Sequence, residues 1–81
     1  MSEQEIFEKV KEIAIDELDV DEDQVVLNAD IKEDLDADSL DLFEIVNELE
    51  DEYDIELDAD ENVKTVDDVV KLVKTQLDNK D

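Results

Sequence analysis

Ser39 is the residue whose type and position best suit chemistry. It lies between Asp38 and Leu40, where a long segment without helical periodicity meets a predicted helix. Serine and aspartate both favour the N-cap position, so an ordinary helix cap is one interpretation. A second interpretation uses the same geometry, because a helix N-terminus offers free N–H groups and a positive dipole end. An exposed hydroxyl there could carry a phosphate-linked group.

The carboxylates are too numerous to indicate a catalytic pair. The 81 residues include 30 acids, seven lysines and no arginine, histidine or cysteine, which gives a formal charge of −23 at pH 7. Without cysteine and histidine, cysteine nucleophiles, zinc–thiolate sites and histidine-based triads are excluded. The charge also argues against nucleic acid as a partner, because its phosphates bind lysine and arginine. We therefore expect a protein that is not an enzyme and whose partners are basic proteins.

A calcium-binding loop is a competing interpretation of part of the acidic sequence. Asp19, Asp21 and Asp23 match the first three ligand positions of an EF-hand loop, and Asp30 falls at the twelfth. However, Gln24 stands where such a loop needs glycine, and aspartate replaces the usual bidentate glutamate. We expect loose binding of divalent cations and no dedicated metal site.

Hydrophobic spacing predicts an all-α fold in a single domain over residues 1–81. Apolar residues recur at helical spacing over Glu3–Leu18, over Ser39–Tyr53 and from residue 65 to about residue 77. A short helix is also expected over Asp58–Lys64. The sequence therefore predicts a small four-helix bundle with a long loop, residues 19–38, between the first two helices and a short third helix.

Local patterns support these boundaries. Ser2 with Glu5, and Thr65 with Asp68, have the spacing of capping boxes. Lys9 lies four residues after Glu5, which favours an ion pair between them. The apolar residues expected to fix the long loop to the core are Val20, Val25, Val26, Leu27, Ile31 and Leu35.

The negative charge is concentrated around the predicted helix 39–53. The segment from Glu33 to Val63 contains 15 acids and no lysine. Neighbours four residues apart, such as Glu44 and Glu48, repel each other on a helix. An acidic face is usually only a solvated surface, but one kept at some cost to stability indicates attraction of basic partners.

The residues around Ser39 resemble a known family. The sequence from Asp34 to Asp41, DLDADSLD, closely resembles the attachment motif of acyl carrier proteins. The similarity continues through the acidic helix and into Lys64-Thr65-Val66, and the first helix also fits, so it covers nearly the whole chain.

The resemblance implies a carrier of growing fatty acyl chains. A phosphopantetheinyl transferase would move 4′-phosphopantetheine from coenzyme A to the Ser39 hydroxyl, with Asp38 helping to place the transferase's magnesium and Leu40 completing the motif. The terminal thiol of the arm would hold acyl groups as thioesters, which supplies the reactive atom that a chain without cysteine lacks.

The resemblance also implies two further sets of residues. Basic patches on the transferase and on the enzymes of fatty acid synthesis would meet a partner-binding face formed by Asp38, Asp41, Glu44, Asn47, Glu50 and Asp51. A cavity sheltering the acyl chain would be lined by Phe43, Val46, Leu49 and Val63, which are equally interpretable as plain core.

Departures from the family pattern leave Ser39 untouched. Aspartate stands at position 36, where the family often has glycine, Asn47 replaces a usual methionine, and Asp58 lies in a region that usually contains proline.

The alternatives are a carrier for D-alanyl, aminoacyl or polyketide groups and, more distantly, an acidic calcium-binding or interaction protein. Because no signal peptide or apolar span is found, we expect a cytoplasmic protein that does not insert into membranes. We also expect it to be a monomer.

Overall fold

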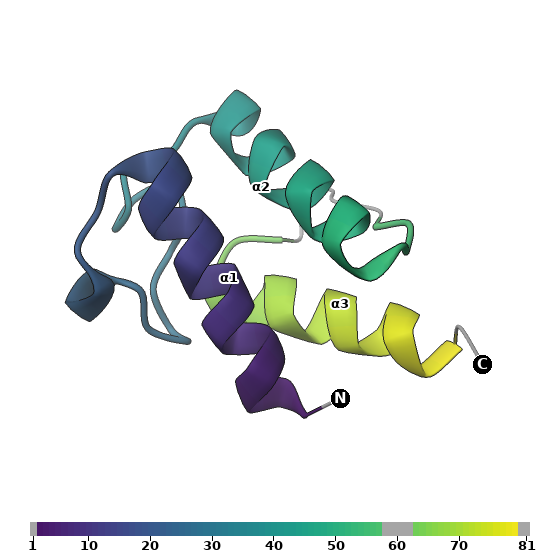
Figure 1. Cartoon of the computed structure of the whole chain (residues 1–81). Coiled ribbons are helices and arrows are strands. Elements are labelled where there is room, and N and C mark those ends of the chain that lie inside the picture. The colour runs from purple at the N-terminus through teal and green to yellow at the C-terminus, as the bar shows by residue number, and fades with distance from the viewer. Residues whose placement is uncertain (1, 58–62, 80–81) are drawn as a thin grey trace.

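The computed structural model describes residues 2–57 and 63–79, which form three α-helices and one short 3₁₀ helix (Figure 1). These elements are α1 (Glu3–Leu18), η1 (Glu22–Gln24), α2 (Ser39–Tyr53) and α3 (Val66–Asn79). Helix α1 packs against both α2 and α3, and α2 also contacts α3. Residues 2–57 and 63–79 contain no β-strand, only an isolated bridge between Asp30 and Thr65. The predicted all-α class is confirmed.

The helix boundaries agree closely with the sequence patterns. Helices α1 and α2 begin and end at the predicted residues, and η1 lies in the loop that joins them. Helix α3 begins at Val66, after its predicted cap, and ends two residues beyond Leu77. Residues 58–62 of the predicted short helix lie outside the described residues, and Val63 and Lys64 are not helical. The described residues therefore contain three α-helices rather than four.

Short polar side chains define the helix ends in this glycine-free sequence. The Glu5 N–H donates to the Ser2 hydroxyl oxygen at 3.3 Å, and that hydroxyl donates to the Glu5 carboxylate at 3.2 Å. At α3, the Asp68 N–H donates to Thr65 Oγ1 at 3.2 Å and the Thr65 N–H donates to the Asp68 carboxylate at 3.1 Å. Both predicted caps are confirmed. Helix α1 ends at Leu18 and is followed by its C-cap Asp19, whose φ of 56° is the left-handed conformation that glycine adopts most easily.

The core lies where the apolar faces of the three helices meet the long loop. Its buried side chains come from α1 (Ile6, Val10, Ile13, Ala14), the loop (Val25, Ala29, Ile31, Leu35, Ala37), α2 (Leu42, Ile45, Val46, Leu49) and the C-terminal segment (Val63, Val66, Val69, Val70, Val73).

The loop is fixed to the core by only some of its expected residues. Val25, Ile31 and Leu35 are buried as predicted, whereas Val26 and Leu27 remain 44% and 46% exposed. Their expected role as core anchors is wrong, because the chain turns at residues 27–28 and leaves both side chains largely at the surface.

Backbone hydrogen bonds tie this loop to the chain that enters α3. The Ile31 N–H donates to the Lys64 carbonyl at 2.8 Å, and the Val66 N–H donates to the Ala29 carbonyl at 3.1 Å. This connection fixes the position from which the chain turns into α2. No helix in the described part of the chain is long and apolar enough to cross a bilayer.

Candidate functional site

Ser39 is the first residue of α2, and its side chain is exposed. The structure corrects the first interpretation of this residue, because the N-cap is Asp38 and Ser39 is not needed as a cap. Among the described residues, no hydrogen-bond partner engages the Ser39 hydroxyl. The hydroxyl therefore lies at the positive end of a 15-residue helix and is accessible from solvent.

Two aspartates hold the backbone on either side of Ser39. The Asp41 N–H donates to Asp38 Oδ1 at 3.0 Å, and the Asp38 N–H donates to Asp41 Oδ2 at 3.3 Å. The Leu42 N–H donates to the Asp38 carbonyl at 3.1 Å, which starts the hydrogen-bond pattern of the helix. This reciprocal capping box satisfies helix N–H groups that would otherwise have no partner.

The chain reaches this cap through a tightly turned loop. The Asp30 carboxylate accepts two backbone N–H groups of the turn that follows it, each at 2.9 Å. Asp36 adopts a left-handed backbone with φ of 57°, the position where the family often has glycine. Ala37 is buried, and its N–H donates to the Ile31 carbonyl at 3.2 Å. The three residues before Ser39 are therefore held by backbone geometry, burial and capping.

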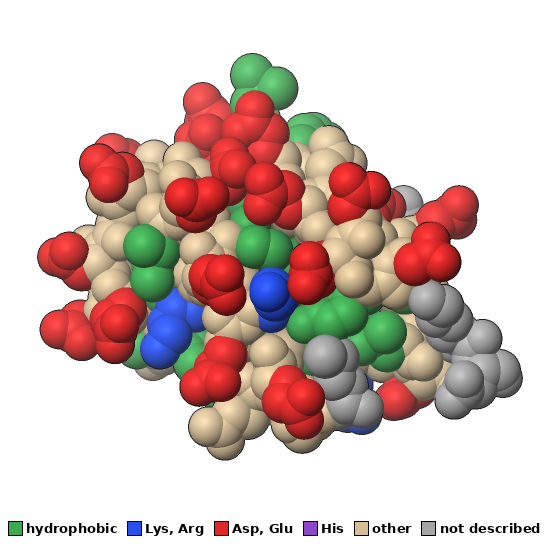
Figure 2. Space-filling view, in the orientation of Figure 1, with side chains coloured by type: hydrophobic (Ala, Val, Ile, Leu, Met, Phe, Trp, Pro, Cys, Tyr) green, Lys and Arg blue, Asp and Glu red, His purple; other side chains and the backbone are tan. Residues whose placement is uncertain are grey.

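The six residues predicted for the partner-binding face do not share one environment. Asp38, Glu44, Asn47 and Asp51 are exposed, whereas Asp41 and Glu50 are half-buried. Glu50 accepts the Leu57 N–H at 2.8 Å and so holds the chain beyond the end of α2. Figure 2 shows acidic side chains crowded over the part of the surface formed by α2.

Two large apolar side chains of α2 also face solvent. Leu40 is 71% exposed and Phe43 is 54% exposed. Of the four residues predicted to line an acyl cavity, Val46, Leu49 and Val63 lie in the core, whereas Phe43 does not join them. The exposed part of α2 thus combines carboxylates with two apolar groups.

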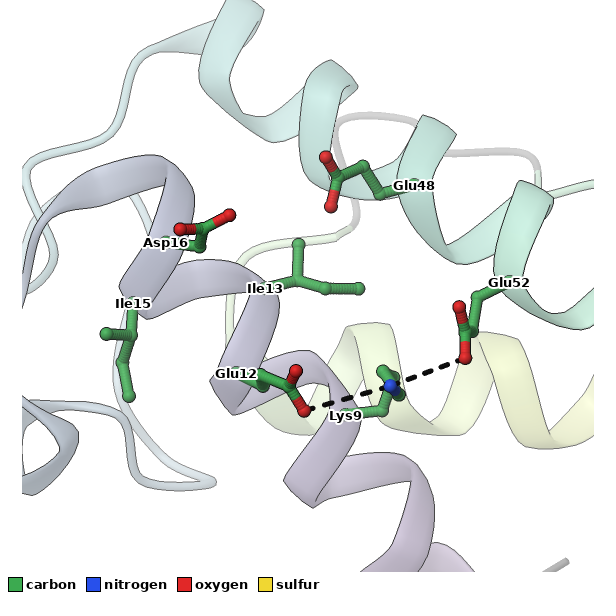
Figure 3. A pocket seen from close by; sticks show the side chains of 7 residues that line it. All are labelled: Lys9, Glu12, Ile13, Ile15, Asp16, Glu48 and Glu52. Atoms are coloured by element: carbon green, nitrogen blue, oxygen red, sulfur yellow. Dashed lines mark ion pairs between the residues drawn. The ribbon is translucent and has the colours of Figure 1, made fainter.

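A cleft between α1 and α2 contains a lysine that links the two helices (Figure 3). Its volume is about 460 Å³. The Lys9 ammonium lies 3.3 Å from the Glu52 carboxylate on α2 and 3.7 Å from Glu12 on its own helix. Both carboxylates raise the pKa of Lys9, with the hydrogen bond to Glu52 as the main cause. The predicted pair with Glu5 is wrong, because the folded chain offers Lys9 a carboxylate from a second helix.

Glu17, near the end of α1, faces the acidic side of α2. Hydrogen bonds with Glu48 and Glu44 are the main causes that raise its pKa from 4.5 to about 7. Sequence reasoning missed both Glu17 and the helix-linking role of Lys9. Periodicity gave no signal for them, because each contact joins residues more than 25 positions apart.

Asp19, Asp21 and Asp23 do not form a metal centre in the described structure. In residues 2–57 and 63–79, no group of three or more acidic side chains is arranged to hold a metal ion. The calcium-binding alternative therefore receives no support from the structure. Ser39 remains the residue best placed to take part in a chemical reaction.

Comparison with known proteins decides the family. The sequence model described as "Phosphopantetheine attachment site" matches residues 8–73. The acyl carrier protein of Lactococcus lactis subsp. cremoris (strain MG1363) is 51% identical over 69 residues, which cover 85% of this chain and 93% of the relative. The chain belongs to the acyl carrier protein family.

Two further acyl carrier proteins support this assignment. That of Streptococcus pneumoniae serotype 4 is 48% identical over 71 residues, covering 88% of this chain and 95% of the relative. That of Lactobacillus acidophilus is 46% identical over 77 residues, covering 93% and 96%. The predicted resemblance is confirmed, as is the predicted role of an acyl carrier with a 4′-phosphopantetheine arm.

Proposed function

We propose that Ser39 carries the 4′-phosphopantetheine arm of this acyl carrier protein. The observation that carries the proposal is the exposed hydroxyl at the first residue of α2, a place that favours a negatively charged phosphodiester. Because Asp38 supplies the cap, modification of Ser39 removes no hydrogen bond from the described structure. The arm supplies a flexible thiol that holds acyl groups as thioesters.

Asp38 has a second role in this proposal. Its Oδ1 accepts the Asp41 N–H at 3.0 Å, and no hydrogen bond to its Oδ2 is found within the described residues. One oxygen can therefore hold the helix cap while the other helps to bind the magnesium ion of a phosphopantetheinyl transferase. Mg²⁺ favours carboxylate oxygens of this kind.

The exposed side of α2 is the proposed docking surface for the transferase and for the enzymes of fatty acid synthesis. Its exposed carboxylates, such as Glu44 and Asp51, would attract basic patches at long range. Leu40 and Phe43 would then be covered on contact, since exposed apolar groups within a polar rim are typical of interfaces. Leu40 also follows Ser39 directly, so docking there brings a partner to the arm.

The cargo is proposed to be a growing fatty acyl chain, since the motif continues as Leu40-Asp41. Val46, Leu49 and Val63 form part of the buried wall that would shelter it, while Phe43 would contribute only after turning inward. D-alanyl, aminoacyl and polyketide groups are the alternative cargoes. The remaining parts of the proposal are a four-helix bundle in one domain and a cytoplasmic, monomeric, non-catalytic protein.

Intact mass measures the attachment directly. Incubation with coenzyme A, magnesium and a broad-specificity transferase is expected to add one phosphopantetheine to the wild type and none to Ser39→Ala. Ser2→Ala is the matched control, because Ser2 is the other serine in the sequence and should leave modification unchanged. Equal mass gain in wild type and Ser39→Ala, or no gain in either, would refute the proposal.

A further inference from the structure

We propose that Asp41 is a positioning residue for Ser39, whose carboxylate fixes the Asp38 backbone and thereby presents the Ser39 hydroxyl to the modifying enzyme. The inference rests on the proposed attachment at Ser39 and adds a residue that acts on it from within the chain. The contact that carries it is the hydrogen bond from the Asp38 N–H to Asp41 Oδ2 at 3.3 Å. Asp38 Oδ1 in turn accepts the Asp41 N–H at 3.0 Å.

The surroundings of Asp41 distinguish it from the other acids of α2. Asp41 is half-buried, whereas Glu44, one turn further along, is exposed, and no backbone N–H of the described residues donates to its carboxylate. A partner's lysine would therefore have to compete with the Asp38 N–H for Asp41, but not for Glu44. A role in attracting a partner's charge does not explain why an Asp41 oxygen accepts the Asp38 N–H.

The capping box can act on Ser39 through the Asp38 peptide, because Asp38 directly precedes Ser39 in the chain. On its N-terminal side, Ala37 is already held by burial and by its hydrogen bond to the Ile31 carbonyl. On its C-terminal side, Leu42 is buried and bonded to the Asp38 carbonyl at 3.1 Å. Between these fixed points, the Asp41 carboxylate restrains the Asp38 N–H. A reacting group held in one orientation reaches the productive geometry more often.

Transferase kinetics separate a positioning role from a charge contact. Asp41→Ala removes both the hydrogen-bond acceptor and the charge, whereas Asp41→Asn removes only the charge. We expect Asp41→Ala to lower kcat about three- to tenfold with little change in KM, the effect of losing one ordinary hydrogen bond. Asp41→Asn should keep the wild-type kcat. Glu44→Gln, the matched control, should change KM and its salt dependence without changing kcat.

Amide hydrogen exchange in the unmodified protein provides a test that does not depend on the transferase. Exchange at the Asp38 amide should be several-fold faster in Asp41→Ala than in wild type, and unchanged in Asp41→Asn and Glu44→Gln. Circular dichroism checks the helices of each variant. Asp41→Leu, which also lacks an acceptor, replaces Asp41→Ala if that variant does not fold.

The outcomes are distinct. If Asp41→Asn loses as much kcat as Asp41→Ala, or if Asp38 exchange is equal in all variants, the positioning role is overturned and Asp41 acts through its charge. If the wild type gains no mass, the proposed attachment fails instead, and the exchange measurement alone decides whether Asp41 restrains the Asp38 backbone.

Discussion

The left-handed backbone at Asp36 allows a sharp test of how the chain enters the Ser39 site. Asp36 lies three residues before Ser39, and its φ is 57°. A left-handed conformation costs most non-glycine residues about 1–2 kcal/mol, whereas glycine avoids this cost but loses about 0.5–1 kcal/mol more backbone entropy on folding. Asp36→Gly and Asp36→Ala both remove the same charge, so their difference isolates the backbone.

The midpoints of these two ranges predict that Asp36→Gly is more stable than Asp36→Ala by about 0.75 kcal/mol. For a domain of this size, 1 kcal/mol shifts the melting temperature by about 4–8 °C. Thermal unfolding followed by circular dichroism at one fixed salt concentration measures the difference. Both variants should still gain the phosphopantetheine mass, because Ser39 and its cap are unchanged.

Asp23 provides a control in which the expected sign is reversed. It lies in η1, and its backbone is not in the left-handed region. There, Asp23→Ala should be more stable than Asp23→Gly by about 0.5–1 kcal/mol, since only the entropy difference applies. If Asp36→Ala melts at or above the temperature of Asp36→Gly, the assignment of backbone strain to Asp36 is refuted.

Three other predictions follow from the site and its surroundings. Asp38→Ala should lower stability by about 1 kcal/mol through loss of the cap, whereas Asp38→Asn should keep most of that stability; both should slow modification if Asp38 helps to bind magnesium. Thermal melts and mass measurements on the same samples will show whether the two effects separate. Because the pKa of Glu17 is raised from 4.5 to about 7, the folded state binds more protons than the unfolded state between those values. This contribution to stability is fully present below pH 4.5 and is lost as the pH rises through 7. Urea unfolding at pH 5 and pH 7.5 should therefore show a smaller fall in stability for Glu17→Gln than for wild type, and an equal fall would contradict the assignment. Replacing Glu44 and Asp51 together by lysine should weaken transferase binding at least about fivefold in low salt and reduce its salt dependence. Unchanged affinity in titrations at low salt would exclude the docking role of these two acids.

Much of the fold follows from local patterns. The limits of α1 and α2 agree with the sequence because each helix has an apolar face with helical spacing, and Ser2 or Asp38 caps its start. Ser39 could likewise be located from sequence, since its position depends on the start of one helix.

The separation of the acidic residues into structural and exposed groups could not be predicted from that pattern. Asp41, Glu44 and Glu50 all lie on α2 and have similar charge, yet Asp41 and Glu50 accept backbone N–H groups whereas Glu44 remains exposed. Glu50 has a structural role because the chain after α2 brings the Leu57 N–H within 2.8 Å of its carboxylate.

The sequence by itself determined the limits of α1 and α2, the caps at Ser2 and Thr65, the charge and the serine that can carry an arm, because these depend on residues within about four positions of one another. Only the tertiary structure decided that Lys9 pairs with Glu52, that Glu17 faces Glu48, and that Val26 and Leu27 stay exposed. The physical reason is distance along the chain. Contacts between α1, α2 and the loop form only when the buried apolar faces bring these elements together. Local residue spacing therefore does not predict which polar groups come into contact.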